Sequence, residues 1–311
     1  MHKRFYKYVA GIVILLLFLP LFSPGPFFMR IATETIMWIG LAVSLDILAG
    51  YTGYLNFGHA LFFGVGAYST AILMNHTSIP FLLTLPIGGV IAGLVAFVVG
   101  VPTLRLKGAY FAIGTWALAL AVQQLALVLP ITGGPDGIRL PPFLNPLFFY
   151  FVMLATVVIT FIVYWVLLEY APLGLKLKAI REDQEGAMAL GLNPSRLKMQ
   201  AFILSAVPAA LLGCTYAYWI TYINPLSAFG DIITDQAVVM AVFGGLGTLI
   251  GPVIGAVTIF SFKTFFWTYL SEYQVLYIII LGAVISMTVL FLPNGVWGSL
   301  MDRFKSKAKT Q

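Results

Sequence analysis

The chain has 311 residues, of which 60% are hydrophobic and only 9% charged, and its formal net charge is +6. A soluble domain usually carries about 25% charged residues, so a soluble enzyme is excluded. The apolar content also excludes a disordered chain, and the single cysteine, Cys214, excludes an intramolecular disulfide and a cysteine-based metal cluster. We therefore expect an all-α, polytopic helical membrane protein.

Stretches without Asp, Glu, Lys or Arg locate the membrane segments, because a crossing helix needs roughly 20 apolar residues. In chain order these stretches are 8–29, 47–104, 108–135, 140–168, 199–230, 236–262 and 273–301. The stretch 47–104 is long enough for two spans, and 31–49 adds a span that carries two acidic residues. Glycines divide 236–262 into a short helix, a break and a second helix. The pattern predicts about ten segments, with the number near 232–270 left open.

The basic residues set the orientation. An even number of alternating segments places both termini and the loop 170–198 on one side of the membrane. Most of the 17 basic residues then lie on that side, while Arg30 and Arg139 lie on the other and Lys263 lies inside a span. Cytoplasmic loops are rich in Lys and Arg, so we expect both termini to be cytoplasmic. The predicted organisation is one transmembrane domain over 1–311, with a cytoplasmic loop at 170–198 and a basic cytoplasmic tail at 293–311.

The first unusual stretch is GYTGYLNFGHALFFGVGAY at 50–68. Glycine lets a helix unwind or lets two backbones approach closely. Unwound segments at membrane depth often bind transported solutes through freed backbone groups. A solute-binding break and close helix packing, with His59 bonded to a neighbouring carbonyl, are both compatible with this pattern. The expected break residues are Gly50, Gly53 and Gly58, with Asn56 and His59 as the polar side chains.

A second glycine-rich stretch, FGGLGTLIGP, occupies 243–252. Glycine lowers helix propensity and proline cannot continue a helix, so the stretch predicts another break. The expected break residues here are Gly244, Gly245, Gly247 and Pro252.

Four ionisable residues fall within predicted spans. A charge is energetically costly there, so each of these residues is a candidate for a functional role. The favoured interpretation places Glu34, Asp235 and Lys263 near the outer interface and Asp46 near the inner one, where this cost is small. Their roles stay open. A proton relay needs several acids at depth, which the sequence does not clearly supply.

The loop sequence IREDQEGAMALGLNPSR at 180–196 carries the signals of a short helix. Gly191 suits the left-handed position after a helix, and Asn193 and Pro194 suit the N-cap and first turn of the next one. Such a helix could fill a pocket on a soluble partner or could be a plain connector. Its acidic residues suit the positive end of a helix dipole: Glu182, Asp183 and Glu185.

Several motifs are absent. The chain has no G-x-x-x-x-G-K-[ST] for ATP, no H-E-x-x-H and no G-x-S-x-G. Its histidines and its cysteine are far apart in sequence. We expect no catalysis, no cofactor and no metal in this chain. The Gly-, Pro- and Asp-rich stretch 131–139 predicts a turn-forming extracytoplasmic loop, with a structural turn and a docking point for an external protein both open.

Taken together, these stretches resemble the LivM/LivH-type permease subunits of branched-chain amino acid ABC transporters. The resemblance covers about residues 35–295, and 104–115 and 132–138 look like the LivM-like member. The stretches that carry it are 50–68, 104–115, 132–138, 180–196 and 243–252.

The resemblance implies a type-II-importer-like permease in a prokaryotic cytoplasmic membrane. It implies four kinds of partner: a second, LivH-like permease, two cytoplasmic ATPases that bind ATP and Mg, an extracytoplasmic solute-binding protein, and membrane lipid. A nucleic-acid partner is not expected. The residues implied to couple to the ATPases are Arg181, Glu182, Asp183, Glu185, Ala189 and Gly191. The candidates for the substrate pathway are Asn56, Phe57, His59, Phe62, Tyr110 and Phe243.

Two other functions stay open. One is an ion-coupled secondary transporter, and the other is the same ABC scaffold importing urea or short amides. The sequence alone leaves undecided the exact substrate and whether the permease pairs with itself or with a different subunit.

Overall fold

The computed structural model describes residues 16–20, 25–77 and 79–269, and short stretches at 279–280, 282–283, 286–287, 290–292 and 295–299. Within them, nearly all regular structure is helical, which confirms the expected all-α fold. Most of the predicted basic tail at 293–311, and much of the predicted segments 8–29 and 273–301, lie outside the described residues.

The elements follow one another with short connections. The helices are α2 Pro26–Thr52, α3 His59–His76, α4 Phe81–Thr103, α5 Ala109–Val128, α6 Pro146–Tyr164, α7 Pro172–Glu182, α8 Gln184–Ala189, α9 Pro194–Ile220, α10 Pro225–Ala228, α11 Asp231–Gly244 and α12 Gly251–Tyr269. Two 3₁₀ turns, η1 Pro130–Thr132 and η2 Gly134–Asp136, follow α5, and a π-helical turn, η3 Trp165–Tyr170, extends α6. The strands are β1 Ile138–Arg139 and β2 Tyr222–Ile223.

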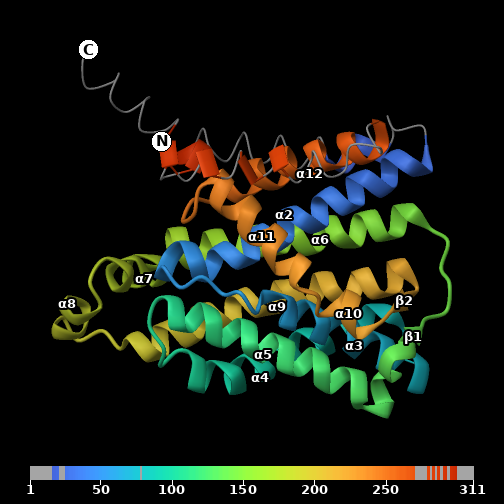
Figure 1. The fold of residues 1–311 in the computed structure, drawn as a ribbon, viewed down its shortest axis with the longest axis horizontal. Helices are drawn as coiled ribbons and strands as arrows, with labels where there is room; N and C mark the ends of the chain where they lie inside the picture. Colours follow the sequence, from blue (N-terminus) through green and yellow to red (C-terminus); the bar gives the residue numbers. More distant parts are fainter. Residues whose placement is uncertain are drawn as a thin grey trace.

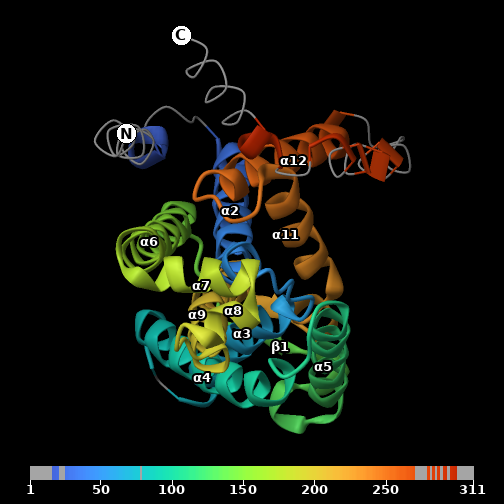
Figure 2. The same ribbon diagram turned by 90° about the vertical axis from the view of Figure 1, so that its left-hand side faces the viewer.

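The long helices run along one axis of the molecule (Figure 1). The helices α7 and α8 lie at one end, here called the α8 end, and β1 and β2 lie at the opposite end, here called the β end. Viewed from the α8 end, α2 lies between α6 and α11, and α9 lies beside α3, between α6 and α4 (Figure 2). Accordingly, 83% of the apolar window of α2 and 67% of that of α9 is buried, against 28% for α4 and α5. The two central helices therefore form the core of the bundle.

Six helices of the described residues are long and apolar enough to cross a membrane. They are Pro26–Thr52, Phe81–Thr103, Ala109–Val128, Pro146–Tyr170, Pro194–Ile220 and Pro225–Gly244. The larger predicted number of segments stays a prediction, because parts of the first and last segments are not described.

The charge-free stretch 199–230 is longer than the helix that it contains, because α9 ends at Ile220. Thr221 takes a left-handed conformation with φ of 64°, and the next residues form β2. That strand pairs antiparallel with β1, Ile138 opposite Ile223. The helix end is thus set by pairing with a distant loop, which local charge cannot reveal.

Glycine brings α3 and α9 into backbone contact. A Cβ at Gly66 would lie 2.0 Å from the carbonyl oxygen of Ala210, and a Cβ at Gly213 would lie 2.0 Å from that of Phe63. Small residues give transmembrane helices their close contacts, because lipid removes most of the hydrophobic drive for helices to associate. Gly66 therefore lies inside α3 without breaking the helix and allows α3 to pack closely against α9.

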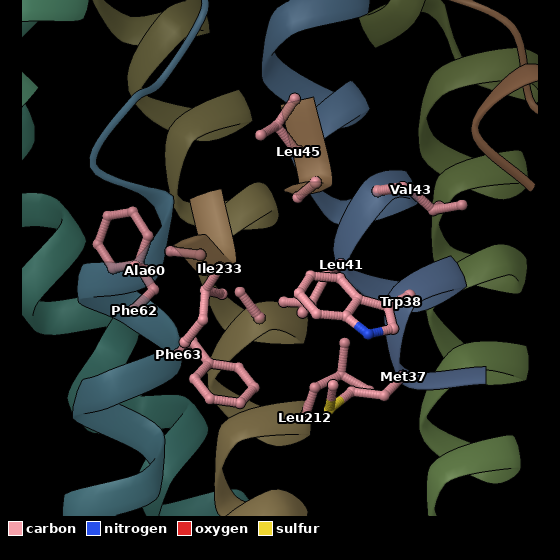
Figure 3. Packing of buried hydrophobic residues seen from close by; sticks show 14 of the residues in the cluster. Met37, Trp38, Leu41, Val43, Leu45, Ala60, Phe62, Phe63, Leu212 and Ile233 are labelled. Carbon is pink, nitrogen blue, oxygen red and sulfur yellow. The ribbon is translucent and has the colours of Figure 1, made fainter. Parts of the chain in front are cut away.

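Larger side chains fill the space around this contact. Figure 3 shows Trp38 and Leu41 of α2, Phe62 and Phe63 of α3, and Leu212 of α9 in one cluster. The ring of Phe62 also meets the ring of Phe202 edge-on, with centroids 5.3 Å apart. Dispersion between such packed groups stabilises the bundle.

Candidate functional site: two helix breaks and the segment that contacts them

The first break is the non-helical stretch 53–58 between α2 and α3. Gly53 ends α2 in a left-handed conformation with φ of 75°, and its N–H donates to the Ala49 carbonyl. The side-chain oxygen of Asn56 accepts from the N–H of Gly58 at 2.9 Å. Gly50 lies just before the break, in the last turn of α2. Side-chain and cap bonds therefore satisfy much of this irregular backbone.

The helix that follows the break starts inside the bundle (Figure 1). The Nε2 atom of His59, the first residue of α3, lies 2.8 Å from the hydroxyl of Ser44, well before the end of α2. The N–H of Ala60 donates to the Thr234 hydroxyl of α11 at 2.8 Å. The positive end of the α3 dipole thus points into the interior.

Four of the predicted pathway residues lie in or next to this break. Asn56, His59 and Phe62 are buried, and Phe57 is half-buried. Within the described part of the chain, the Nδ2 atom of Asn56 and the Nδ1 atom of His59 have no hydrogen-bond partner. Buried polar atoms of this kind are uncommon and call for an explanation.

The other two predicted pathway residues lie on other helices. Phe243 is half-buried near the end of α11. Tyr110 is 75% exposed at the start of α5. Its neighbour Phe111 is the residue that packs on the first break, with its ring edge-on to Tyr54 at 5.1 Å. No signal in the sequence indicated that Phe111 faces this break, because only packing shows which ring of an adjacent aromatic pair faces inward, and the role of Tyr110 stays a prediction.

The second break is the non-helical stretch 245–250 between α11 and α12. Gly244 is the last residue of α11, and Pro252 is the second residue of α12. Gly245 and Gly247 have φ of 118° and 77°, values that favour glycine.

Asp46 of α2 contacts the second break. Its Oδ1 atom accepts from the N–H of Gly247 at 2.7 Å, and its Oδ2 atom accepts from the hydroxyl of Tyr164 at 2.7 Å. Asp46 is 0% exposed, so protein atoms surround its carboxylate, and its placement near the inner membrane interface stays a prediction. Its partners are Tyr164 of α6 and Gly247 of the second break. Both residues are far from Asp46 in the sequence, so residue spacing does not predict these contacts.

The helices α7 and α8 contact the first break directly. Arg181, near the end of α7, donates from Nη1 to the carbonyl oxygen of Gly50 at 2.5 Å. Lys198 of α9 donates to the Tyr54 hydroxyl and to the Gln184 side-chain oxygen, both at 2.6 Å. Neither Lys198 nor Gln184 was among the predicted site residues. A lysine at the start of an apolar span was the available signal.

The helix α8 is short and capped at its start. The sequence predicted one helix over 182–190, whereas the structure has α7 through Glu182 and α8 over Gln184–Ala189. Asp183 separates them and caps α8, its carboxylate accepting from the N–H of Glu185 at 3.0 Å.

The turn after α8 follows the predicted pattern. Gly191 has φ of 82°, and Asn193 caps α9 by accepting from the N–H of Arg196 at 3.1 Å. Ala187 is buried, whereas Met188 and Leu190 are exposed. Like Arg181, the other coupling candidates are exposed: Glu182, Asp183, Glu185, Ala189 and Gly191.

In the part of the chain that the structure describes, no group of three His, Cys, Asp or Glu side chains could hold a metal ion.

The sequence also matches known proteins. The family model described as "Branched-chain amino acid transport system / permease component" matches residues 27–289. The chain belongs to this family. This permease is 30% identical over 311 residues to the high-affinity branched-chain amino acid transport system permease protein LivM of Salmonella typhimurium, covering 89% of this chain and 72% of the relative.

Two further relatives agree. The LivM protein of Escherichia coli is 30% identical over 310 residues, covering 89% of this chain and 71% of the relative. The LivH protein of Salmonella typhimurium is 24% identical over 285 residues, covering 83% and 90%. No solved structure was found to match this permease. The resemblance to LivM-like permeases is thus confirmed, and the chain is a non-catalytic, multi-pass transport subunit.

Proposed function

We propose that this permease is a membrane-spanning subunit of an ABC importer for branched-chain or related hydrophobic amino acids. Family membership supports the transport class, and the names of the LivM relatives support the cargo. The complete importer would contain a LivH-like second permease, two cytoplasmic ATPases that bind ATP and Mg, and an extracytoplasmic solute-binding protein. The α8 end and both termini would face the cytoplasm of a prokaryotic cell.

The observation that carries this proposal is the direct contact of α7 and α8 with the first break. Arg181 holds the Gly50 carbonyl, and Lys198 joins Gln184 of α8 to Tyr54 of the break. A displacement of α8 therefore acts on the break through hydrogen bonds, with no intervening flexible linker. This is the connection that a coupling segment over 180–196 requires.

The surface of α8 supports docking to the ATPases. Leu190 is 84% exposed and Met188 is exposed beside it, while Glu182 and Glu185 add charge around them. Exposed apolar side chains with a polar rim are typical of protein interfaces. The caps at Asp183 and Asn193 hold the short helix as one rigid piece.

The first break supports passage of a solute. The Nδ2 atom of Asn56 can donate to polar groups of an amino acid, and the Nδ1 atom of His59 can donate or accept according to its tautomer. The rings of Phe57, Phe62 and Phe243 supply apolar contact for its side chain. Such weak contacts permit release, which a tight site would slow.

The test is reconstitution of the chain with its partner permease, ATPases and binding protein in liposomes, followed by ATP-dependent uptake of labelled leucine. We expect Leu190→Asp to reduce uptake roughly thirtyfold, because a buried interface side chain is worth about 2 kcal/mol. The matched control is Leu144→Asp, since Leu144 is equally apolar and 95% exposed but lies before α6 at the β end.

Other outcomes select other functions. Uptake by this chain alone, driven by a proton or sodium gradient, would indicate an ion-coupled secondary transporter. ATPase stimulation by a binding protein loaded with urea or a short amide, without leucine uptake, would retain the ABC class and change the cargo. Equal uptake by Leu190→Asp and the wild type would contradict the coupling role of α8.

A further inference from the structure

Asp46 of α2 is fully buried and uses both carboxylate oxygens. One accepts from the N–H of Gly247 and the other from the hydroxyl of Tyr164, each at 2.7 Å. A carboxylate away from water is tolerated only when its oxygens are hydrogen-bonded, and removing one partner of such a group is costly. Asp46 therefore ties α2 to α6 and to the second break.

The last turn of α2, which leads into the first break, touches the second break backbone to backbone at this point. A Cβ at Gly50 would lie 2.3 Å from the backbone nitrogen of Gly247, and a Cβ at Gly247 would lie 2.8 Å from the carbonyl oxygen of Gly50. Gly247 also has φ of 77°, which side chains rarely adopt. No side chain separates the two segments, so a shift of one break must be felt by the other.

A single side chain connects this contact to α7. Gly50 lies in the last turn of α2, where backbone carbonyls lack partners within the helix. The guanidinium of Arg181 donates to the Gly50 carbonyl at 2.5 Å, and a cation is favourable at the negative end of a helix dipole. The Nη1 atom of Arg181 also lies 3.0 Å from the Cβ position of Gly247. Arg181 thus reaches both breaks.

We propose that these groups form a latch that holds the two breaks together at the α8 end, with Asp46 as its positioning residue. The inference rests on the proposed transport function. Movement of α7 with its ATPase withdraws Arg181 from Gly50, and the second break then separates from α2 and opens the solute path. The latch consists of Asp46, Gly50, Tyr164, Arg181 and Gly247.

The first test compares Asp46→Asn with Asp46→Leu in the reconstituted complex. The measured quantity is leucine imported per ATP hydrolysed. Asparagine keeps an oxygen for the Gly247 N–H and an amide for the Tyr164 oxygen, so we expect a ratio near that of the wild type. Leucine removes both hydrogen bonds, and we expect the ratio to fall about tenfold or more while ATP hydrolysis continues.

A matched tyrosine pair controls for the loss of a buried hydroxyl. Tyr164 and Tyr150 are both buried in α6, but Tyr150 donates to the Leu16 carbonyl at 2.6 Å, away from the latch. We expect Tyr164→Phe to lower the ratio about fivefold and Tyr150→Phe to leave it unchanged.

A labelling measurement separates a latch from a merely structural contact. Leu246→Cys places a thiol in the second break. In the otherwise wild-type complex, we expect a membrane-impermeant maleimide to reach it from the α8 end only during ATP hydrolysis. In the Asp46→Leu background, we expect labelling without ATP. A purely structural role would lower thermal stability and leave this ATP dependence intact.

The latch would be overturned if the Asp46→Leu complex imported as much leucine per ATP as the wild type and if its labelling still required ATP. If Asp46→Leu fails to assemble, Arg181→Met and Arg181→Lys decide the question, because only lysine keeps a donor for the Gly50 carbonyl. Arg181→Met should then lower the leucine imported per ATP hydrolysed, as expected for Asp46→Leu. Arg181→Lys should keep this ratio near that of the wild type. Absence of uptake by the wild-type complex would contradict the proposed transport function, whereas labelling of Leu246→Cys still decides the latch.

Discussion

Single glycines decide how closely α3 and α9 pack. At Gly66, the space for a Cβ is already occupied by the carbonyl oxygen of Ala210. A backbone atom cannot rotate away as a flexible side chain can. The contact therefore depends on this residue type at this position.

We expect Gly66→Ala to destabilise the protein by about 1–3 kcal/mol, which is the usual cost of overpacking a well-packed interior. The matched control is Gly93→Ala in α4, where a Cβ would meet Ile203 and Val207 at an ordinary 3.8 Å. The measurement is the temperature at which half of the detergent-solubilised protein remains monodisperse. Equal midpoints for the two variants would contradict the close α3–α9 contact.

The role of Asp46 also depends on its contacts. Its residue type indicated a charge that is energetically costly within a span, and its partners come from α6 and the second break. The role therefore follows from contacts that only the folded chain creates.

At the scale of elements, α8 is too short to be stable by itself. Helices of fewer than about 12 residues are marginal in water, and α8 covers only Gln184–Ala189. The carboxylate of Asp183 supplies its N-cap, and Gly191 and Asn193 control the turn into α9. Its rigidity is thus built from the residues at its ends.

We expect Asp183→Ala to cost about 1 kcal/mol in helix stability and to weaken ATPase binding about fivefold. Asp183→Asn retains a capping oxygen and should bind as the wild type does. The measurement is the affinity of purified ATPase for the permease in nanodiscs. An equal loss in both variants would indicate that the charge matters and the cap does not.

At the scale of the whole molecule, the α8 end and the β end lie at opposite ends of the bundle (Figure 1). The strands β1 and β2 join the loop after α5 to the end of α9 at one end, and α7 and α8 lie at the other. This polarity should match the two sides of the membrane.

Thiol labelling tests that orientation. The native Cys214 is fully buried and donates to the Gly66 carbonyl at 3.1 Å, so we expect the wild type to resist a membrane-impermeant maleimide. In intact cells, Leu144→Cys should be labelled and Leu190→Cys should not. Permeabilised cells should label both. The reverse result in intact cells would overturn the proposed topology.

The sequence by itself determined the class of this protein. Its scarcity of charge required a membrane, its glycine-rich stretches at 50–68 and 243–252 contained the interruptions between helices, and the signals at Gly191 and Asn193 fixed the start of α9. These features are local, because glycine, proline and capping residues act on the backbone within a few positions.

Tertiary structure alone decided which of these local features meet. It brought Gly50 against Gly247, turned Arg181 toward α2, buried Phe111 while leaving its neighbour Tyr110 exposed, and ended α9 at β2. Each of these depends on residues far apart in the chain. Within an apolar bundle, almost every surface is chemically alike, so hydropathy cannot select the partner. Close backbone approach and the pairing of buried polar groups make that selection.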